Sequence, residues 1–374
     1  MSSFDCDIAI AGAGPGGAAI ARQLAQSGCR VVLLERSRFD GPRVGESLAP
    51  AVQPLLTELG VWQEFVDLKP LPSYGTRSVW GGPLEAEHSH LLNPYLCGWH
   101  VDRVAFDRML ANSAVSAGVQ LLLGEQVARC VSGSNGGFTL SLSQGDEIHA
   151  GFVIDATGRG STLARKLGAK SLAFDRLVGV AAQFENARAG ARCYTLVETT
   201  PDGWWYSAPV GNDRSVVMLM TDGDLMPQWS EALSRAGLTS ASVAGCEMKW
   251  GPRVFSAVSR RLQRTDRCHK RWLAVGDAAL AVDPISGSGV VRALQTAKAA
   301  AATVLSSLSG DDSAIAAYEA DRDKECTEYL FKRIGYYGLE RRWPTSPFWQ
   351  RRLAAAERLW HSNHAHILGV ADGL

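Results

Sequence analysis

Residues 7–17 read DIAIAGAGPGG and residues 30–36 read RVVLLER, and these two stretches decide the fold. The first begins as a short apolar strand and passes directly into a G-x-G-x-x-G turn. An alanine-rich helical pattern follows over residues 18–26, and the second stretch is an apolar strand that ends on the acid Glu35. A strand, a glycine turn, a helix and a second strand ending in an acid predict one βαβ unit that binds a dinucleotide.

Each glycine of this turn has a mechanical reason. Gly12 allows the tight turn, Gly14 lets the backbone approach a pyrophosphate, and Gly17 lets the helix and the strand pack closely. The helix N-terminus faces the phosphates with unpaired N–H groups and the positive end of its dipole. Glu35, about twenty residues past the glycines, can bind the hydroxyls of an adenosine ribose. The candidates for cofactor binding in this unit are Gly12, Gly14, Pro15, Gly17, Glu35 and Arg36.

The composition restricts the kinds of partner that the protein is expected to bind and the cell compartment in which it is expected. The chain has 374 residues, with 38 Lys+Arg and 38 Asp+Glu, so bulk electrostatics do not favour a nucleic-acid partner. No window approaches about 20 uninterrupted apolar residues, so no integral membrane segment is expected, and no secretory signal is visible in residues 1–6. The eight cysteines occur singly without a C-x-x-C pair, which favours reduced thiols in the cytoplasm and no metal site.

Further motifs follow in a fixed order. They are VGES at residues 44–47, GWHVDRVAFD at 98–107, DATGRGS at 155–161, AVGDAA at 274–279 and DPISGSGV at 283–290. Together with the glycine turn they resemble, nearly end to end, the FAD-dependent monooxygenase fold of the para-hydroxybenzoate hydroxylase type. The resemblance implies an α/β fold: a Rossmann-like FAD-binding domain of the glutathione-reductase type, an inserted antiparallel β-sheet substrate domain and a C-terminal helical tail.

The resemblance also implies FAD as the cofactor and extends the list of residues that bind it. Asp277 is expected to bond a ribitol hydroxyl, and the backbone N–H groups that start the helix after residue 290 are expected to face the pyrimidine ring of the flavin. The cofactor residues implied beyond the first unit are Arg43, Glu46, Ser47, Arg103, Val127, Asp155, Ala156, Gly158, Gly276, Asp277, Pro284, Gly287, Ser288, Gly289 and Val290.

The expected division of the chain interleaves the two domains. The FAD-binding domain takes residues 1–70, 98–171 and 261–310, the substrate domain takes 71–97 and 172–260, and the helical tail takes 311–374. Within these parts we expect a hairpin over residues 127–132 and 138–143, and apolar strands near 178–182, 193–198, 204–209 and 215–220. We expect helices over 51–59, 228–236 and 291–308, and a helical tail from 314 interrupted at 335–338 and 341–344.

The VGES loop, the segment WWYSAP at residues 204–209 and the Trp/Arg-rich tail are similar to the tryptophan-halogenase-like branch of this fold. Two departures matter. Halogenases carry a lysine two residues before the glycine that matches Gly75, and this chain has Ser73 there; their W-x-W-x-I-P motif is also altered. Because that lysine forms the halogenating species, its absence argues against a halogenase. Lys69 lies in another register before Pro70 and is expected in a solvated loop.

The tail segment YYGLERRWPTSPFW at residues 336–349 looks like that of the flavoprotein maturases of lysine ε-oxidase and glycine oxidase. Those enzymes oxygenate a tryptophan inside a partner protein during cysteine tryptophylquinone formation. The resemblance implies that reduced FAD and O₂ form a C4a-hydroperoxide, which hydroxylates an indole ring of a precursor oxidase protein. Only one dinucleotide fingerprint is present, so NAD(P)H must bind transiently or a separate reductase must supply the electrons.

Candidate substrate and catalytic residues follow from the same pattern. Trp80, Trp204, Trp205 and Tyr206, with Trp99 as a further candidate, are expected to form an aromatic wall for the substrate ring. Glu46 and Asp283 are the candidate general bases; on the other reading, both carboxylates only fix loops over the flavin.

Three other functions stay open from the sequence. The first is hydroxylation of a free small aromatic in natural-product biosynthesis, and the second is reduction of isoprenoid double bonds, which the missing membrane-facing apolar stretch disfavours. The third is a non-catalytic FAD-bound assembly factor, which steady NAD(P)H consumption would exclude.

Overall fold

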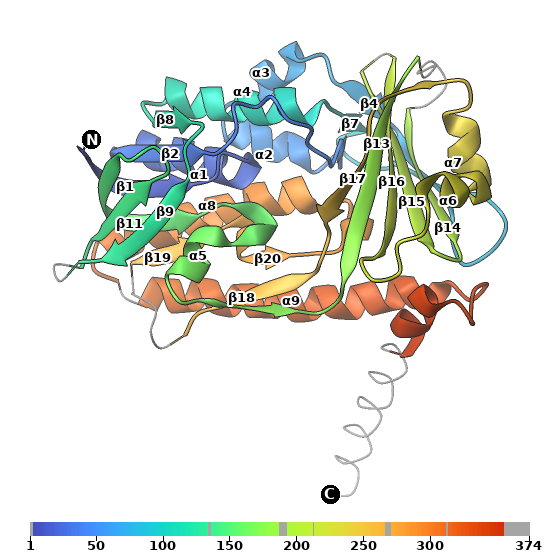
Figure 1. Ribbon diagram of the computed structural model, residues 1–374. Coiled ribbons are helices and arrows are strands. Elements are labelled where there is room, and N and C mark those ends of the chain that lie inside the picture. Colours follow the sequence, from blue (N-terminus) through green and yellow to red (C-terminus); the bar gives the residue numbers. More distant parts are fainter. Residues whose placement is uncertain are drawn as a thin grey trace, which may run out of the picture.

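The computed structural model describes residues 3–133, 136–186, 193–211, 213–265, 271–311 and 313–354. A sheet of mainly parallel strands with its helices occupies one side of the molecule, an antiparallel sheet occupies the other, and the long helix α9 runs along both (Figure 1). This confirms the predicted α/β fold class. Residues 134–135 of the predicted hairpin turn and residues 355–374 of the predicted tail lie outside the described residues.

The first sheet grows from the βαβ unit. Strand β1 pairs in parallel with β2 and with β11, β2 pairs with β8, and β11 pairs with β19. The central strands are apolar on both faces, because one face packs against helices and the other packs against the β9–β10 hairpin and the short helix at residues 162–166. The antiparallel hairpin β9–β10 continues the sheet beyond β11 and confirms the predicted hairpin. The strand bounds are β1 (Ser3–Ala11), β2 (Val31–Glu35), β8 (Gln120–Leu123), β9 (Val127–Ser132), β10 (Phe138–Leu142), β11 (Glu147–Asp155) and β19 (Trp272–Ala274).

Helices α1 (Pro15–Gln26), α4 (Arg103–Ser116) and α8 (Gly289–Leu308) pack together with this sheet. The buried alanines of α1 and α8 let the two helices approach closely, and their side chains join one apolar core. The N-termini of α1 and α8 are thereby fixed near the carboxyl ends of the parallel strands, where open α/β sheets bind their ligands.

The second sheet has the order β17-β13-β16-β15-β14-β5-β6 and is antiparallel except for the β14–β5 pair. Strands from residues 75–89 therefore join strands from residues 177–256 in one sheet. The strand bounds are β5 (Gly75–Val79), β6 (Ala86–Ser89), β13 (Leu177–Glu185), β14 (Tyr194–Thr200), β15 (Gly203–Val210), β16 (Arg214–Asp222) and β17 (Glu247–Ser256).

The two faces of this sheet are covered differently. Helices α6 (Trp229–Arg235) and α7 (Gly237–Ser242) pack on one face, where Trp205 meets Trp229 at 4.9 Å between ring centroids. The other face carries Trp204 and is covered by aromatic side chains of the C-terminal segment. Strand alternation explains this division, because neighbouring residues of β15 point to opposite faces.

Shorter elements complete the described chain. Two small sheets have the orders β3-β7-β4 and β12-β18-β20. Among the described residues no helix is long and apolar enough to cross a membrane. The remaining bounds are α2 (Val52–Glu58), α3 (Trp62–Asp67), α5 (Thr162–Lys166), β3 (Ser47–Leu48), β4 (Leu71–Ser73), β7 (Gly98–His100), β12 (Lys170–Ala173), β18 (Arg260–Gln263) and β20 (Leu280–Ala281).

Helix α9 (Ser313–Leu339) corrects one expectation about the tail. The break predicted at residues 335–338 was wrong, because α9 continues through both glycines to Leu339. A glycine costs a helix only about 1 kcal/mol, and burial of Tyr337 against the aromatic cluster outweighs this cost. The predicted break at 341–344 is confirmed, and helical conformation resumes at residues 347–354.

Trp205→Ala should lower the free energy of unfolding by about 3–5 kcal/mol, because it leaves a large cavity under α6 and α7. Leu92→Ala is the control: that side chain is 99% exposed, and its loss should change stability by about 0.5 kcal/mol or less. Urea unfolding measures both variants. Equal effects would show that Trp205 is not a core residue.

Candidate flavin site

The glycine turn after β1 is shaped by close backbone packing. Gly12 has φ +103°, and a Cβ there would overlap the carbonyl oxygen of Ala156 at the end of β11. A Cβ at Gly17 would overlap the Gly12 carbonyl oxygen and lie 2.9 Å from the Ala156 Cβ. At Gly14, by contrast, a Cβ would meet no protein atom within 4 Å. Gly12 and Gly17 are therefore required by the fold, whereas Gly14 leaves open space in front of the helix.

Glu35 is held at the edge of this turn by groups that fix its orientation. Its Oε2 accepts a hydrogen bond from the Ala13 N–H at 3.0 Å, and its Oε1 accepts from the Ser37 hydroxyl at 2.6 Å. Arg43 pairs with the same Oε1 at 3.0 Å and with Asp107 at 2.7 Å. Helix α1 begins without a side-chain cap. An uncapped helix N-terminus beside open space and a fixed acid fits the diphosphate and ribose of FAD. Arg36, the last candidate of this unit, is exposed.

The segment at residues 43–47 is bound to α4 through Arg103. The Arg103 Nη1 donates to the Val44 carbonyl at 2.7 Å, and Nη2 pairs with Asp107 at 3.1 Å. Gly45 has φ +99°, and a Cβ there would lie 2.6 Å from the Arg103 Nη1. We call residues 43–47 the strap. Arg103 therefore fixes the backbone of the strap over the candidate flavin site. A cavity of about 200 Å³ opens beside it; its lining residues include Arg43, Glu46, Arg103, Arg214, Lys249 and Trp250.

Glu46 is fully buried, and only one of its two carboxylate oxygens has a hydrogen-bond partner. Its Oε2 accepts from the Gly45 N–H at 3.0 Å, while its Oε1 has no hydrogen-bond partner. Burial raises the pKa of Glu46 to about 7, although Arg103 and the Tyr206 hydroxyl nearby oppose the shift. A carboxyl with a pKa near neutrality can both hold and release a proton under physiological conditions.

Ser47 extends this polar contact toward the antiparallel sheet. Its Oγ lies 2.9 Å from the Tyr206 hydroxyl, 2.7 Å from the Thr195 hydroxyl and 3.2 Å from the His100 Nδ1. Burial lowers the pKa of His100 to about 4, so this imidazole is neutral at physiological pH. Thr195 and His100 were not among the predicted site residues, and only the strand pairing of β3 with β7 brings His100 to Ser47.

Both carboxylate oxygens of Asp155 accept hydrogen bonds from the protein itself. Oδ1 accepts from the Thr157 N–H and hydroxyl at 2.8 and 2.6 Å, and Oδ2 accepts from the Ala164 N–H at 2.7 Å. The residue therefore fixes the turn that contains Ala156 and Gly158, and it presents no free oxygen to a ligand. Val127 lies at the start of β9 and packs on the apolar core around β11.

The AVGD motif ends β19 and is tied to α8 and to the turn after β11. The Gly276 N–H donates to the Thr296 hydroxyl of α8 at 3.1 Å. Asp277 lies 3.3 Å from Arg159 and keeps part of its side chain exposed, so its carboxylate can still accept from a ligand hydroxyl.

Asp283 introduces the loop that leads into α8. Its Oδ1 accepts from the Ile285 N–H at 3.0 Å and caps the turn at Pro284–Ser286, and its Oδ2 accepts from the Tyr337 hydroxyl at 2.8 Å. The Tyr337 oxygen in turn accepts from the Trp204 Nε1–H at 2.9 Å. One chain of hydrogen bonds thus joins the loop at 283–290 to the tail and to the sheet. Burial raises the pKa of Asp283, and Arg333 at 3.4 Å opposes that shift. The loop's remaining candidates are Gly287, Ser288, Gly289 and Val290.

The structure brings together some of the predicted aromatic residues and separates others. Trp80, Trp204 and Tyr206 belong to one cluster, in which Trp80 and Trp204 lie 6.2 Å apart between ring centroids. Trp205 faces α6 on the opposite side of the sheet, and Trp99 packs against Trp62 of α3. Sequence reasoning did not include three tail side chains of this cluster, which are Tyr337, Phe348 and Trp349.

Ser73, at the position of the halogenase lysine, is buried at the end of β4. Its carbonyl oxygen accepts from the His90 Nδ1 at 3.2 Å. Lys69 is exposed in the preceding loop, and Lys249, which lines the 200 Å³ cavity, is paired with Glu185. Within the described ranges no group of three or more His, Cys, Asp and Glu side chains is placed to hold a metal ion.

The uncapped helix, the fixed acid and the small-residue turns fit a dinucleotide, and the comparisons identify it as FAD. The chain matches the FAD binding domain family over residues 5–330 and belongs to that family. It is 30% identical over 372 residues to LodB of Marinomonas mediterranea, described as an FAD-dependent oxidoreductase; the match covers 95% of this chain and 98% of LodB. The comparisons confirm FAD as the cofactor and a flavin-dependent oxidoreductase as the class of enzyme.

Solved structures show the same fold. The myxobacterial chondrochloren halogenase CndH aligns with a TM-score of 0.84 at 24% identity, over 98% of this chain and 90% of CndH. QhpG, a peptidyl tryptophan dihydroxylase essential for tryptophylquinone cofactor biogenesis, aligns with a TM-score of 0.76 at 23% identity, over 93% of this chain and 79% of QhpG.

Gly14→Ala should lose most of the bound FAD while unfolding at the same temperature as the apoprotein of the parent chain. The new methyl group meets open space in the protein but stands where the diphosphate must approach. Gly82→Ala, which also meets nothing within 4 Å and lies outside the cavity beside the strap, is the control and should keep its flavin. Flavin absorbance per protein measures the result. Full FAD retention in Gly14→Ala would place the diphosphate elsewhere.

Glu46→Gln should make stability less dependent on pH. The folded-state pKa of about 7 lies above the ordinary 4.5, so the proton on Glu46 contributes stability fully below about pH 4.5. That contribution is lost as the pH rises through 7, and it amounts to roughly 1.4 kcal/mol for each pH unit between the unfolded and folded pKa values. The variant should therefore gain stability relative to the parent between pH 5 and pH 8, as urea unfolding across this range would measure. Glu58→Gln, half exposed, is the control; an equal response would contradict the raised pKa.

Proposed function

We propose that this protein is an FAD-dependent monooxygenase that hydroxylates the indole ring of a tryptophan held in a partner polypeptide. Three things support the proposal: the family, the similarity to LodB along nearly the whole chain, and the fold shared with the peptidyl tryptophan dihydroxylase QhpG. The tail at residues 336–349, which looks like that of the flavoprotein maturases, supports the same reading.

We call the face of the antiparallel sheet that carries Trp204 and Tyr206 the aromatic face. The observation that carries the proposal is that side chains of the protein's own tail cover this face. Trp204, Tyr337, Phe348 and Trp349 are each about 1% exposed, so solvent barely reaches their side chains. Trp80 contacts Tyr337 and Trp349 with centroid distances of 5.8 and 5.6 Å. Small-molecule sites are usually preformed cavities, whereas this face must be opened before a ring can reach it. A partner polypeptide, which brings a large interface, can supply the free energy for that opening.

Halogenation is disfavoured by Ser73, which stands where halogenases carry their catalytic lysine. The small side chain of Ser73 is buried among its neighbours and cannot supply the amine that the halogenase chemistry needs. Lys69, the nearest lysine in sequence, is exposed, and Lys249, which lines the 200 Å³ cavity, is paired with Glu185. These observations favour transfer of oxygen rather than halogen on the halogenase-like fold.

FAD, once reduced, supplies the activation of O₂, and the chain's own residues orient the ring and move protons. Glu46 is the candidate base, because its Oε1 is free and its pKa lies near neutrality. Asp283 holds the Tyr337 hydroxyl and the turn of its own loop, which makes it a positioning residue. Trp80 and Tyr206, two of the predicted substrate residues in the aromatic cluster, keep partial exposure, and they are the candidates to contact the incoming indole.

NAD(P)H or a separate reductase is the proposed electron donor, and the test begins with flavin reduction. Anaerobic bleaching of the flavin by NADH and NADPH should remain slow when free tryptophan, indole or a phenol is added. Aerobic incubation with a tryptophan-containing precursor polypeptide should add oxygen to that polypeptide, which intact mass spectrometry measures. Glu46→Gln should lower the rate of oxygen addition at least tenfold at neutral pH, because general bases contribute about 10²–10⁴-fold.

Strong acceleration of reduction by a free small aromatic would contradict the polypeptide substrate and favour a small-molecule hydroxylase. Absence of any NAD(P)H consumption and of any oxygen addition, with the precursor still bound, would identify an assembly factor without turnover. The matched control is Glu58→Gln, which changes the same charge on the surface and should leave the rate of oxygen addition unaltered.

A further inference from the structure

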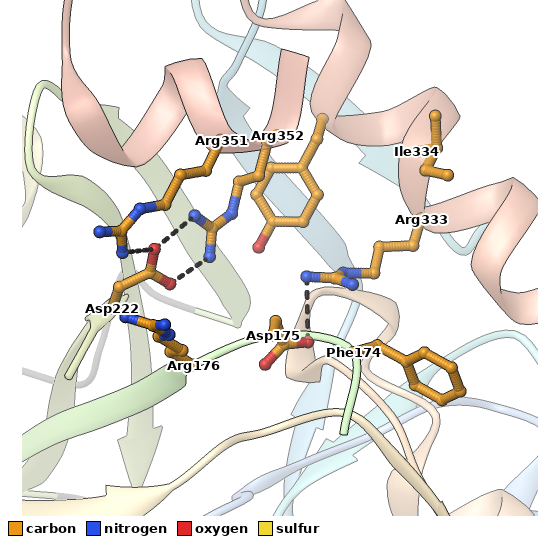
Figure 2. A pocket seen from close by; sticks show the side chains of 9 residues that line it. Phe174, Asp175, Arg176, Asp222, Arg333, Ile334, Arg351 and Arg352 are labelled. Atoms are coloured by element: carbon orange, nitrogen blue, oxygen red, sulfur yellow. Dashed lines mark hydrogen bonds and ion pairs between the residues drawn. The ribbon is translucent and has the colours of Figure 1, made fainter. Parts of the chain in front are cut away.

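A second cavity, of about 350 Å³, is lined by Tyr337 but not by its cluster neighbours Trp80 and Trp204. Four parts of the chain form its walls: the β12–β13 connection, the end of β16, the helix α9 and the helical residues 347–354. Figure 2 shows arginines from three of these parts converging on it. The lining residues are Phe174, Asp175, Arg176, Asp222, Arg333, Ile334, Tyr337, Arg351 and Arg352.

The lining contains four arginines and two aspartates, and two further aspartates, Asp224 and Asp283, pair with these arginines, so the charges of the cluster balance. The two deeper arginines are committed to the fold. Arg352 is almost fully buried and makes a two-pronged pair with Asp222 at 2.8 and 3.2 Å. Arg333 pairs with Asp175 at 3.0 Å and faces Asp283 at 3.4 Å. These contacts fix the floor of the cavity and leave the outer arginines to meet a ligand.

The outer arginines are Arg176 and Arg351. Arg351 pairs with Asp222 at 2.9 Å, and both arginines share Asp224 at the edge of the cavity. Asp224 accepts from the Arg176 Nη1 at 3.0 Å and from both terminal nitrogens of Arg351 at 2.8 Å. Arg176 has a side chain 73% exposed and Arg351 one 40% exposed. Exposed ion pairs are weak, so an incoming anion can compete with Asp224 for these two guanidinium groups. A planar guanidinium fork favours a planar carboxylate.

The remaining wall is apolar. The partly exposed side chains of Phe174 and Ile334 offer the cavity a surface that suits a ring or an aliphatic side chain, and the buried ring of Tyr337 belongs to the same wall. The Tyr337 ring is held in place by Arg352 at 4.9 Å and Arg333 at 5.6 Å from its centroid. Its hydroxyl reaches Asp283, so the wall of this cavity is one hydrogen bond from the loop at 283–290.

We propose that this cavity is a binding site for a carboxylate attached to an apolar group, with the carboxylate held by Arg176 and Arg351 and the apolar group against Phe174 and Ile334. The carboxylate comes either from a free organic acid or from an acidic residue beside an apolar one in a polypeptide. The site is separate from the strap and the glycine turn. It concerns binding alone, so it can fail while the proposed hydroxylation stands, and the reverse also holds.

The test is calorimetric titration of the FAD-loaded protein at low salt with two probes. Benzoate represents the free acid, and the capped dipeptide acetyl-Phe-Glu-amide represents the polypeptide; benzamide and acetyl-Phe-Gln-amide are their uncharged counterparts. At least one carboxylate probe should bind roughly tenfold tighter than its amide, because a hydrogen bond to a charged group is of that strength. The probe that binds more tightly identifies the source.

Arg176→Gln and Arg351→Gln should each weaken the carboxylate probe about tenfold. Arg30→Gln is the matched control for Arg176: its side chain is 67% exposed, it also pairs with a single aspartate, Asp7, and its loss should leave binding unchanged. Asp224→Asn removes the internal competitor and should tighten binding. This gain cannot arise from damage to the fold.

Equal binding of each carboxylate and its amide would overturn the proposal. So would equal affinities of Arg176→Gln and Arg30→Gln, or weaker binding by Asp224→Asn. The flavin absorbance should also be followed on saturation with the carboxylate probe. A shift that is retained in Arg30→Gln and lost in Arg351→Gln would show in addition that binding in this cavity changes the surroundings of the flavin through Tyr337.

Discussion

The hydroxyl of Tyr337 is the contact on which the rest of the site depends. It accepts from the Trp204 Nε1–H and donates to the Asp283 Oδ2, so one oxygen atom joins the sheet, the tail and the loop before α8. All three side chains are buried, and buried polar groups must be paired to be tolerated. If the tail left the aromatic face, the Trp204 indole N–H would therefore be unpaired and the Asp283 Oδ2 would lose the Tyr337 hydroxyl, while the Asp283 Oδ1 would keep the Ile285 N–H. This coupling ties access to the aromatic face to the loop at 283–290.

The part of the fold that the sequence predicts well is local. Gly12 and Gly17 are dictated by contacts between β1, α1 and the end of β11, and these contacts arise within one βαβ unit and its neighbour. Glu35 follows at the expected place because β2 lies beside β1 in parallel. Motifs of this kind contain both the backbone shape and the chemistry, so their positions in the sequence are sufficient.

The parts that could not be predicted depend on pairing between distant strands or on packing of the tail. Which face of β15 Trp204 and Trp205 occupy is set by the register with β14 and β16, and a shift of one residue exchanges them. The role of Tyr337 could not be seen because Gly335 and Gly338 indicate a break, whereas helix packing carries α9 through them. The aromatic residues of the tail were the available signal, and only tertiary structure shows which ring is bonded to Asp283.

The central claim is that the flavin ring lies between the strap and the loop at 283–290, with the aromatic face closed by the tail until a partner opens it. A crystal structure of the FAD complex without substrate tests this most directly. We expect the isoalloxazine between Glu46 and Pro284, with the Tyr337 hydroxyl still bonded to Trp204 and Asp283. A flavin ring elsewhere, or an open cavity along Trp204 in the absence of any substrate, would contradict it.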